Sequence, residues 1–269
     1  SWRDTLKETA VIAGMQPAVV TEVLGDRFLL MLHGGASAEL LWENGPATAK
    51  PYRNENSTGS PVESPAELFA AGDLIRVRQD EEGQWRLAQI PAAQAALVSL
   101  NAADGAIISI VGGMGFELSK FYRATQAQRQ PGSNFKPFLY SAALEAGFTA
   151  ASIINDAPIV LADSSLEDIW RPENDSGKFF GPTRLRWALT KSRNLVSIRL
   201  LQQLGIPALI DYSQRFGFNT AQFAPDLSLA LGTHSMTPLE VAAAYAVLAN
   251  GGFLVEPYMI SRVDYSTGK

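Results

Sequence analysis

The hydrophobic pattern of the sequence changes near residue 93, and this change constrains the fold more than any other feature. Before it, short apolar runs such as Ala18–Leu24 and Arg27–Leu32 alternate with turns rich in Gly, Asn and Pro. Short strands at this close spacing are typical of a small β barrel or sandwich. After it, helical patterns dominate, which predicts an α+β protein with segregated strands and helices rather than alternating ones.

These patterns divide the chain into three segments. Residues 1–16 are predicted to be a short lead-in that ends near Gly14, residues 17–92 a small all-β domain, and residues 93–269 a second domain. Within the β domain, a stretch over roughly 44–65 is rich in Asn, Ser, Gly and Pro and is predicted to be a loop.

The second domain is predicted to open with a β hairpin and to continue mainly as helices. The hairpin joins Ala95–Leu100 to Ala106–Val111 through Asp104-Gly105, and its apolar runs predict buried strands. Helices are then expected over about 133–146, 183–190, 195–204, 207–216 and 238–250. Gly147, Gly205 and Gly251 follow three of these helices, as glycine commonly does at helix ends.

Composition and charge exclude several functional classes. The formal net charge is −5 and no basic stripe is visible, which argues against a nucleic-acid partner. The chain has no cysteine and only two histidines, His33 and His234, so thiolate chemistry and a three-histidine metal site are excluded. We therefore expect neither a metal nor a cofactor, and we place His234 in a loop or at the polar surface.

No membrane or export signal is recognisable in the sequence. No uncharged apolar run reaches the length needed to span a bilayer. The N-terminal residues also lack the basic region followed by an apolar core that a signal peptide requires.

The segment Gln130–Pro137 carries the most chemical information. Proline is tolerated in the first turn of a helix but not in its interior, so Pro137 places the helix start close to Ser133. Residues three apart share a helix face, so the Lys136 amine is predicted to reach the Ser133 hydroxyl. A desolvated lysine loses its proton readily and then activates a serine for acyl transfer without any histidine.

The spacing alone is weak evidence. With 21 serines and 7 lysines in the chain, about 0.5 matches to Ser-x-x-Lys are expected by chance. The alternative interpretation is a helix-capping Ser133 beside a solvated Lys136. A second match, Ser266–Lys269, is interpreted as chance, and Ser192–Asn194 is one of two Ser-x-Asn matches.

Several ordered motifs together resemble the penicillin-binding proteins. The segment Arg129–Phe138 (RQPGSNFKPF) resembles their active-serine segment, Trp170–Asn174 (WRPEN) a mid-domain marker, and Lys191–Asn194 (KSRN) their second motif. Further stretches that resemble their later helical segments are Leu227–Gly232, Thr237–Glu240 and Ala249–Gly252. The likeness is to class A (bifunctional) members, in a branch whose transpeptidase domain follows an OB-like β domain, which 17–92 fits.

The resemblance implies a serine D,D-transpeptidase of peptidoglycan synthesis. Ser133 would be the acylated nucleophile, Lys136 the nearby base, Ser192 a proton relay to or from the leaving group, and Asn194 a holder of Lys136 and of the substrate amide. The substrates would be peptidoglycan stem peptides, β-lactams would acylate the same serine, and the protein would work at the periplasmic face of the bacterial inner membrane.

One family motif is absent from this chain. The third motif, Lys-Thr/Ser-Gly on the strand beside the active site, has no match, and Thr267-Gly268-Lys269 is expected to belong to a hairpin turn. We therefore expect a C-terminal remainder of the same protein to supply the Lys-Thr-Gly strand and the missing sheet strands. A glycosyltransferase domain and a membrane anchor are likewise expected ahead of residue 1.

Two alternatives remain open at the level of sequence. The same serine would also serve a D,D-carboxypeptidase or a serine β-lactamase. Residues 17–92 could instead act as a non-catalytic docking platform for a regulatory lipoprotein or a partner synthase, because OB-type folds commonly bind through one face.

Overall fold

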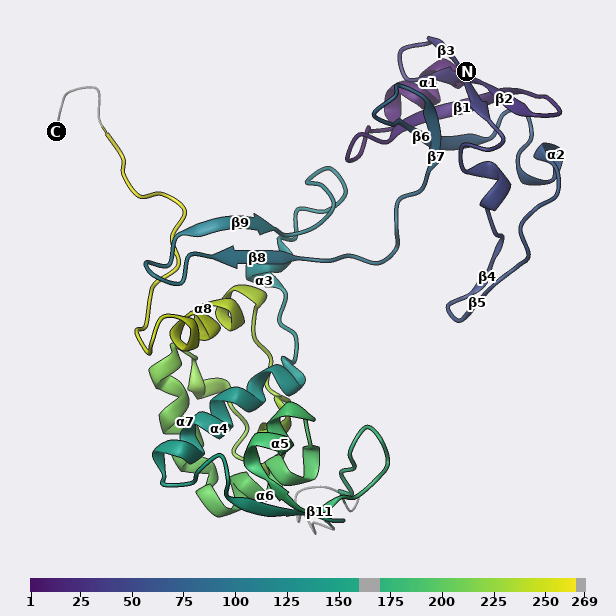
Figure 1. Ribbon diagram of the computed structural model, residues 1–269. Helices are drawn as coiled ribbons and strands as arrows, with labels where there is room; N and C mark the ends of the chain where they lie inside the picture. Colours follow the sequence, from purple (N-terminus) through teal and green to yellow (C-terminus); the bar gives the residue numbers. More distant parts are fainter. Residues whose placement is uncertain (160–169, 265–269) are drawn as a thin grey trace. The chain divides into compact units, whose positions relative to one another are not determined.

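The computed structural model describes residues 1–159 and 170–264 (Figure 1). Contacts divide the chain into two compact parts. The first comprises residues 1–95 with 113–120, and the second comprises residues 96–112 with 121–269. The predicted turn at Thr267-Gly268-Lys269 and the match Ser266–Lys269 lie outside the described residues.

The first part is built on a five-stranded antiparallel sheet with the order β3-β2-β1-β6-β7. The two outermost strands of this order, β3 and β7, also contact each other, so the sheet curls toward a barrel as the OB-like prediction requires. Its elements are α1 (Trp2–Glu8), β1 (Gln16–Val23), β2 (Arg27–Leu32), β3 (Ser37–Leu41), β6 (Leu74–Gln79) and β7 (Trp85–Ala88).

Alternating side chains of these strands form the core of the first part. In β2, Phe28, Leu30 and Leu32 are buried while Leu29 and Met31 between them are partly exposed, which is the period of two that a half-buried strand shows. The predicted loop over 44–65 contains short elements that its polar composition conceals. They are η1 (Pro46–Thr48), the hairpin β4 (Tyr52–Asn54) and β5 (Ser57–Thr58), and the start of α2 (Pro65–Leu68).

The predicted hairpin of the second part is confirmed, but the predicted burial of its strands is wrong. The hairpin pairs β8 (Leu97–Leu100) with β9 (Ile107–Val111), yet Leu97 is 53% exposed and Ile108 is 69% exposed. Helix α8 (Pro238–Ala249) packs against β8 (Figure 1), and the described strands add no third strand to this sheet. Apolar runs of this kind therefore indicate strands without fixing which faces are covered.

The predicted helices are confirmed, with small shifts at their ends. The segment predicted over 133–146 consists of a 3₁₀ turn, η2 (Gly132–Phe135), that continues directly into α4 (Lys136–Glu145). The other α-helices are α3 (Arg123–Gln126), α5 (Leu185–Thr190), α6 (Asn194–Leu204) and α7 (Ile206–Ser213), and the further 3₁₀ turns are η3 (Gln214–Phe216), η4 (Thr220–Gln222) and η5 (Leu227–Leu231). A hairpin of β10 (Ile153–Asp156) and β11 (Gly181–Arg184), which the sequence analysis did not identify, precedes α5.

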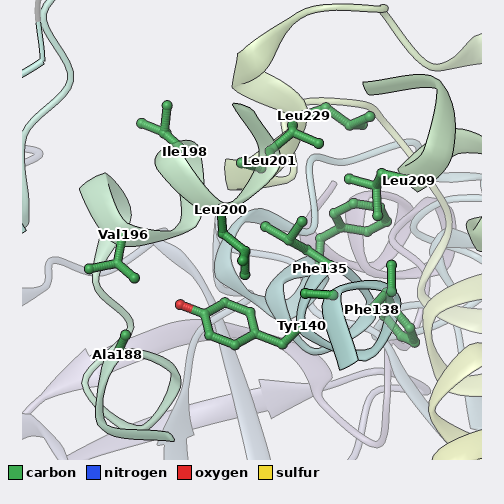
Figure 2. Close-up of a cluster of buried hydrophobic side chains, with 14 of the residues drawn as sticks. Phe135, Phe138, Tyr140, Ala188, Val196, Ile198, Leu200, Leu201, Leu209 and Leu229 are labelled. Carbon is green, nitrogen blue, oxygen red and sulfur yellow. The ribbon is translucent and has the colours of Figure 1, made fainter. Parts of the chain in front are cut away.

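The core of the second part is centred on α4 and α6. Figure 2 shows Phe135 and Phe138 beside Leu200, Leu201 and Leu209 in one cluster of buried side chains. Leu200 and Leu201 are fully buried, and each side chain of this size contributes roughly 1.5–3 kcal/mol on burial. This packing holds the N-terminal ends of α4 and α6, which carry the candidate site, in a fixed relation.

Across residues 1–159 and 170–264, the helices are all too short or too polar to cross a membrane.

Candidate active site

Ser133 lies in the 3₁₀ turn η2, immediately before helix α4. Gly132, which precedes Ser133, has a φ of +57°, and its N–H donates to the carbonyl of Gly232 over 3.1 Å. A Cβ at position 232 would collide with the Gly132 carbonyl, so only glycine permits this close backbone approach. The prediction that Ser133 lies at the start of a helical segment is therefore correct, with one 3₁₀ turn before the α-helix proper.

Ser192 lies in the tight turn between α5 and α6. Its φ is +52°, a left-handed conformation that is uncommon for a residue other than glycine. Such strain persists where surrounding contacts fix the backbone, and it is found preferentially at functional sites. Here the conformation accompanies two contacts of Ser192, one through its carbonyl and one through its hydroxyl, with the same lysine.

The Lys136 amine joins the two motifs. Its Nζ lies 2.7 Å from the Ser192 carbonyl oxygen, 3.0 Å from Ser192 Oγ and 2.6 Å from Asn194 Oδ1. Ser192 Oγ in turn lies 3.0 Å from Ser133 Oγ. The four sequence-predicted residues are thus brought together, but the polar contacts of Lys136 lead to Ser133 through Ser192 rather than directly, in contrast to the direct reach predicted.

The donor and acceptor types of these partners fix the direction of a proton path. As an ammonium, Lys136 has three hydrogens for three acceptors. As a neutral amine it has two hydrogens and a lone pair, and a carbonyl oxygen can only accept. Ser192 Oγ is the one partner of the three that can donate to the lone pair, so it then accepts from the Ser133 hydroxyl. The neutral state therefore orders a chain from Ser133 through Ser192 to Lys136.

Burial favours that neutral state. Lys136 is only 1% exposed, and its desolvation lowers the pKa of the amine from its ordinary value of 10.5 to about 8, while the charge of Asp175 acts in the opposite direction. A lysine with a pKa near 8 is well matched to general-base chemistry close to neutral pH.

Asn194 is held from the loop that contains the mid-domain marker. Its Nδ2 donates to the carbonyl of Glu173 over 2.9 Å, which leaves Oδ1 facing Lys136. The backbone N–H of Asn194 donates to Asn174 Oδ1 over 2.9 Å. The marker Trp170–Asn174 is visible in the sequence, but it predicts no role for Glu173 or Asn174, because nothing in their spacing shows that they meet a helix twenty residues away.

His234 lies in a loop, as one of the two predicted alternatives has it, but the residue is buried, which corrects the alternative of a polar surface position. The side chain packs against Phe135 at 4.4 Å and Phe223 at 4.0 Å between ring centroids, and the residue is 6% exposed. Desolvation lowers its pKa to about 4, so the ring is neutral at physiological pH. Its neighbours in the sequence, Thr233 and Ser235, are polar and favour a surface position, although the ring packs against Phe135 of η2.

Within the described parts of the chain, no group of three or more acidic or histidine side chains is arranged to hold a metal ion. The residues of the site are instead suited to proton transfer between hydroxyls and an amine.

The depressed pKa of Lys136 predicts a pH-dependent contribution to stability. Between about pH 8 and 10.5 the unfolded chain binds a proton that the folded site does not, so the free energy of unfolding rises with pH. Relative to Lys136→Met, the wild-type protein should gain on the order of 3 kcal/mol across this window. Chemical denaturation at a series of pH values measures the difference between the free energies of unfolding of the two proteins. The titration of groups present in both, such as Tyr140, cancels in this difference.

Lys191→Met is the matched control, since Lys191 is an exposed lysine stacked on Trp187 in the neighbouring turn. It should leave the pH slope of the wild-type protein unchanged. Equal slopes for the wild-type protein and Lys136→Met would contradict a neutral buried amine.

Comparison with known proteins assigns both parts of the chain to the family that the sequence motifs resemble. Residues 1–93 match the family of the penicillin-binding protein OB-like domain, and residues 95–269 match the penicillin binding protein transpeptidase domain. Penicillin-binding protein 1A of Pseudomonas aeruginosa is 49% identical over 269 residues, which are all of this chain and 33% of that protein.

Two solved structures are also similar. The crystal structure of penicillin-binding protein 1A from Haemophilus influenzae has a TM-score of 0.83 and 40% identity, covering 99% of this chain and 38% of that one. PonA1 from Mycobacterium tuberculosis, solved in complex with penicillin V, has a TM-score of 0.58 and 26% identity over 66% of this chain and 50% of that one.

The chain spans about a third of the length of the curated relative from P. aeruginosa. On this evidence, the chain belongs to the penicillin-binding protein family and contains the OB-like domain and residues of the transpeptidase domain.

Proposed function

We propose that the domain at 95–269 belongs to a serine D,D-transpeptidase that crosslinks peptidoglycan stem peptides ending in D-Ala-D-Ala, with Ser133 as the acylated residue. The observation that carries this proposal is the hydrogen-bonded series of Ser133 Oγ, Ser192 Oγ and Lys136 Nζ, with both steps at 3.0 Å. The membership of the transpeptidase family supports the reaction class.

Acylation begins when Ser133 Oγ attacks the carbonyl carbon of the penultimate D-Ala. The hydroxyl proton passes to Ser192 Oγ while the Ser192 proton passes to the neutral Lys136 amine. The backbone N–H of Ser133, in the first helical turn, supplies one donor for the oxyanion. The carbon–nitrogen bond then breaks, the proton returns through Ser192 to the leaving amine, and free D-Ala departs with Lys136 neutral again.

The second half of the reaction reverses this proton path. An amine of a neighbouring stem peptide attacks the ester carbon, and its surplus proton is taken up by Lys136. The ester bond to Ser133 breaks, and Ser192 returns the proton to Ser133 Oγ. The product is a new peptide bond between two stems, and the enzyme regains its starting state. Asn194, whose Oδ1 contacts the amine at 2.6 Å, keeps Lys136 in place throughout.

β-Lactams are expected to acylate the same serine. The similar protein PonA1 was solved in complex with penicillin V. A strained lactam carbonyl offers the serine the same reaction, and the ring keeps its leaving nitrogen attached, so the ester persists. A long-lived ester distinguishes the transpeptidase from the alternative activities of a β-lactamase, which would hydrolyse the ester rapidly.

The setting of the whole protein also belongs to this proposal. We place the domain at the periplasmic face of the inner membrane, where stem peptides are crosslinked. A C-terminal strand with Lys-Thr-Gly would complete the site by binding the substrate carboxylate, and a glycosyltransferase domain would supply the glycan strands.

The proposal predicts a covalent penicilloyl adduct on Ser133. Intact-protein mass spectrometry of the full-length protein incubated with penicillin should show one added penicillin, and peptide mapping should place it on Ser133. Ser133→Ala should lose the adduct, whereas the matched variant Ser266→Ala, at the other Ser-x-x-Lys match, should keep it. No adduct on the wild-type protein, or an adduct that survives Ser133→Ala, would reject the assignment.

The OB-like domain is proposed to dock a regulatory lipoprotein or a partner synthase. It contains a cavity of about 440 Å³ lined largely by apolar side chains, among them Leu68, Phe69 and Leu87. Deleting residues 17–92 should abolish the stimulation of crosslinking by such a partner and leave the unstimulated acylation of Ser133 unchanged. Crosslinking assays with and without the partner measure this, and identical stimulation of both proteins would contradict docking at 17–92.

A further inference from the structure

The start of helix α6 is capped by a side chain that is distant in sequence. The residue at the N-cap position, Arg193, makes no side-chain capping hydrogen bond. Instead, Asn174 Oδ1 accepts from the backbone N–H of Asn194 at 2.9 Å and from that of Leu195 at 3.5 Å. Asparagine is among the best N-cap residues, and here it satisfies the first N–H groups of the helix from twenty residues away.

The other end of the Asn174 amide is anchored in a buried polar cluster. Its Nδ2 donates to Asp156 Oδ1 over 2.8 Å and to the Lys178 carbonyl over 2.9 Å. Asp156 is fully buried at the end of β10, and Asn174 is 5% exposed. Both hydrogens of the amide are therefore used, and its oxygen can point only toward α6. Removing one partner of such a buried cluster leaves the others unsatisfied.

Glu173 and Asn174 together hold Asn194 at two points. The Glu173 carbonyl accepts from Asn194 Nδ2, and the Asn174 side chain accepts from its backbone N–H. With these two points fixed, Asn194 Oδ1 faces Lys136 Nζ at 2.6 Å. We propose that Asn174 is a positioning residue for the reaction, because it sets the place of Asn194 and thereby the place of the Lys136 amine. This inference rests on the proposed function of Ser133 and Lys136.

The test measures how fast penicillin acylates the full-length protein and what fraction becomes labelled. Asn174→Ala should lower the rate constant of acylation by about 10- to 100-fold, since small displacements of catalytic groups cost this much. The fraction labelled at long times should stay complete, because the folded protein remains competent. A merely structural role would lower the labelled fraction and leave the rate constant of the folded molecules unchanged.

Asn250→Ala is the matched control. The Asn250 side chain also makes four hydrogen bonds, donating to the carbonyls of Ala102 and Phe253 and accepting from the N–H groups of Gly252 and Phe253. It fastens the end of α8 rather than the start of α6. The variant should lower the melting temperature without changing the rate constant of acylation.

Asn174→Asp provides a second readout that depends on pH. It keeps the acceptor toward α6 but places a carboxylate against Asp156, and repulsion between two carboxylates this close raises the pKa of one of them, so that group takes up a proton as the pH falls. That proton restores a donor to Asp156, so the rate relative to the wild-type protein should rise as the pH falls from about 8 to about 6. Asp156 lies 3.9 Å from Arg193 and raises the pKa of Tyr140, and Lys136, on which Asp175 acts, is linked to the cluster through Asn194. All of these groups are also present in the wild-type protein. Dividing the acylation rate of Asn174→Asp by that of the wild-type protein removes the titration that the two proteins share.

The outcomes separate this inference from the proposed function. A slow but completely labelled Asn174→Ala, together with a ratio for Asn174→Asp that rises at lower pH, would establish the positioning role. A wild-type rate constant for Asn174→Ala, or a pH-independent ratio for Asn174→Asp, would overturn it while leaving Ser133 as the nucleophile. Absence of labelling in the wild-type protein would instead overturn the proposed function.

Discussion

The burial of one lysine amine is the constraint on which the rest of the site depends. Lys136 can stay almost fully inside the protein because three oxygens, two from Ser192 and one from Asn194, lie within hydrogen-bond distance of its amine. The cost of burying the charge lowers its pKa and makes the amine a base. The same hydrogen bonds place Ser192 Oγ between that base and Ser133. The low pKa of the Lys136 amine and the position of Ser192 beside Ser133 therefore depend on the same buried contacts.

The fold serves this arrangement by bringing two helix starts together. Helix α4 begins with Lys136 and α6 begins with Asn194, and both helices bury their apolar faces in the cluster around Phe138 and Leu200 (Figure 2). The packing of a rigid core thereby sets the distance between the amine and its acceptors. The loop with Glu173 and Asn174 then adjusts the orientation of one side chain, Asn194.

Local signals made much of this predictable. Pro137 places the start of the helix that follows Ser133, and short apolar runs between turns, such as Arg27–Leu32, indicate the β domain. The meeting of Ser133, Lys136, Ser192 and Asn194 was predicted through the family resemblance, since neither spacing says that residues 56 apart touch. Long-range packing determines three features that short sequence patterns do not contain: the indirect link from Lys136 to Ser133, the burial of His234 and the capping of α6 by Asn174.

The pH dependence of serine acylation tests the central claim most directly. The second-order rate constant for penicillin acylation of the full-length protein should rise about tenfold per pH unit below pH 8 and level off above it, because it reports the free enzyme's base. Lys136→Arg, which cannot become neutral, should lose the rise together with most of the rate. A profile that is flat through pH 8, or that rises only near the ordinary lysine value of 10.5, would contradict a neutral Lys136 as the base.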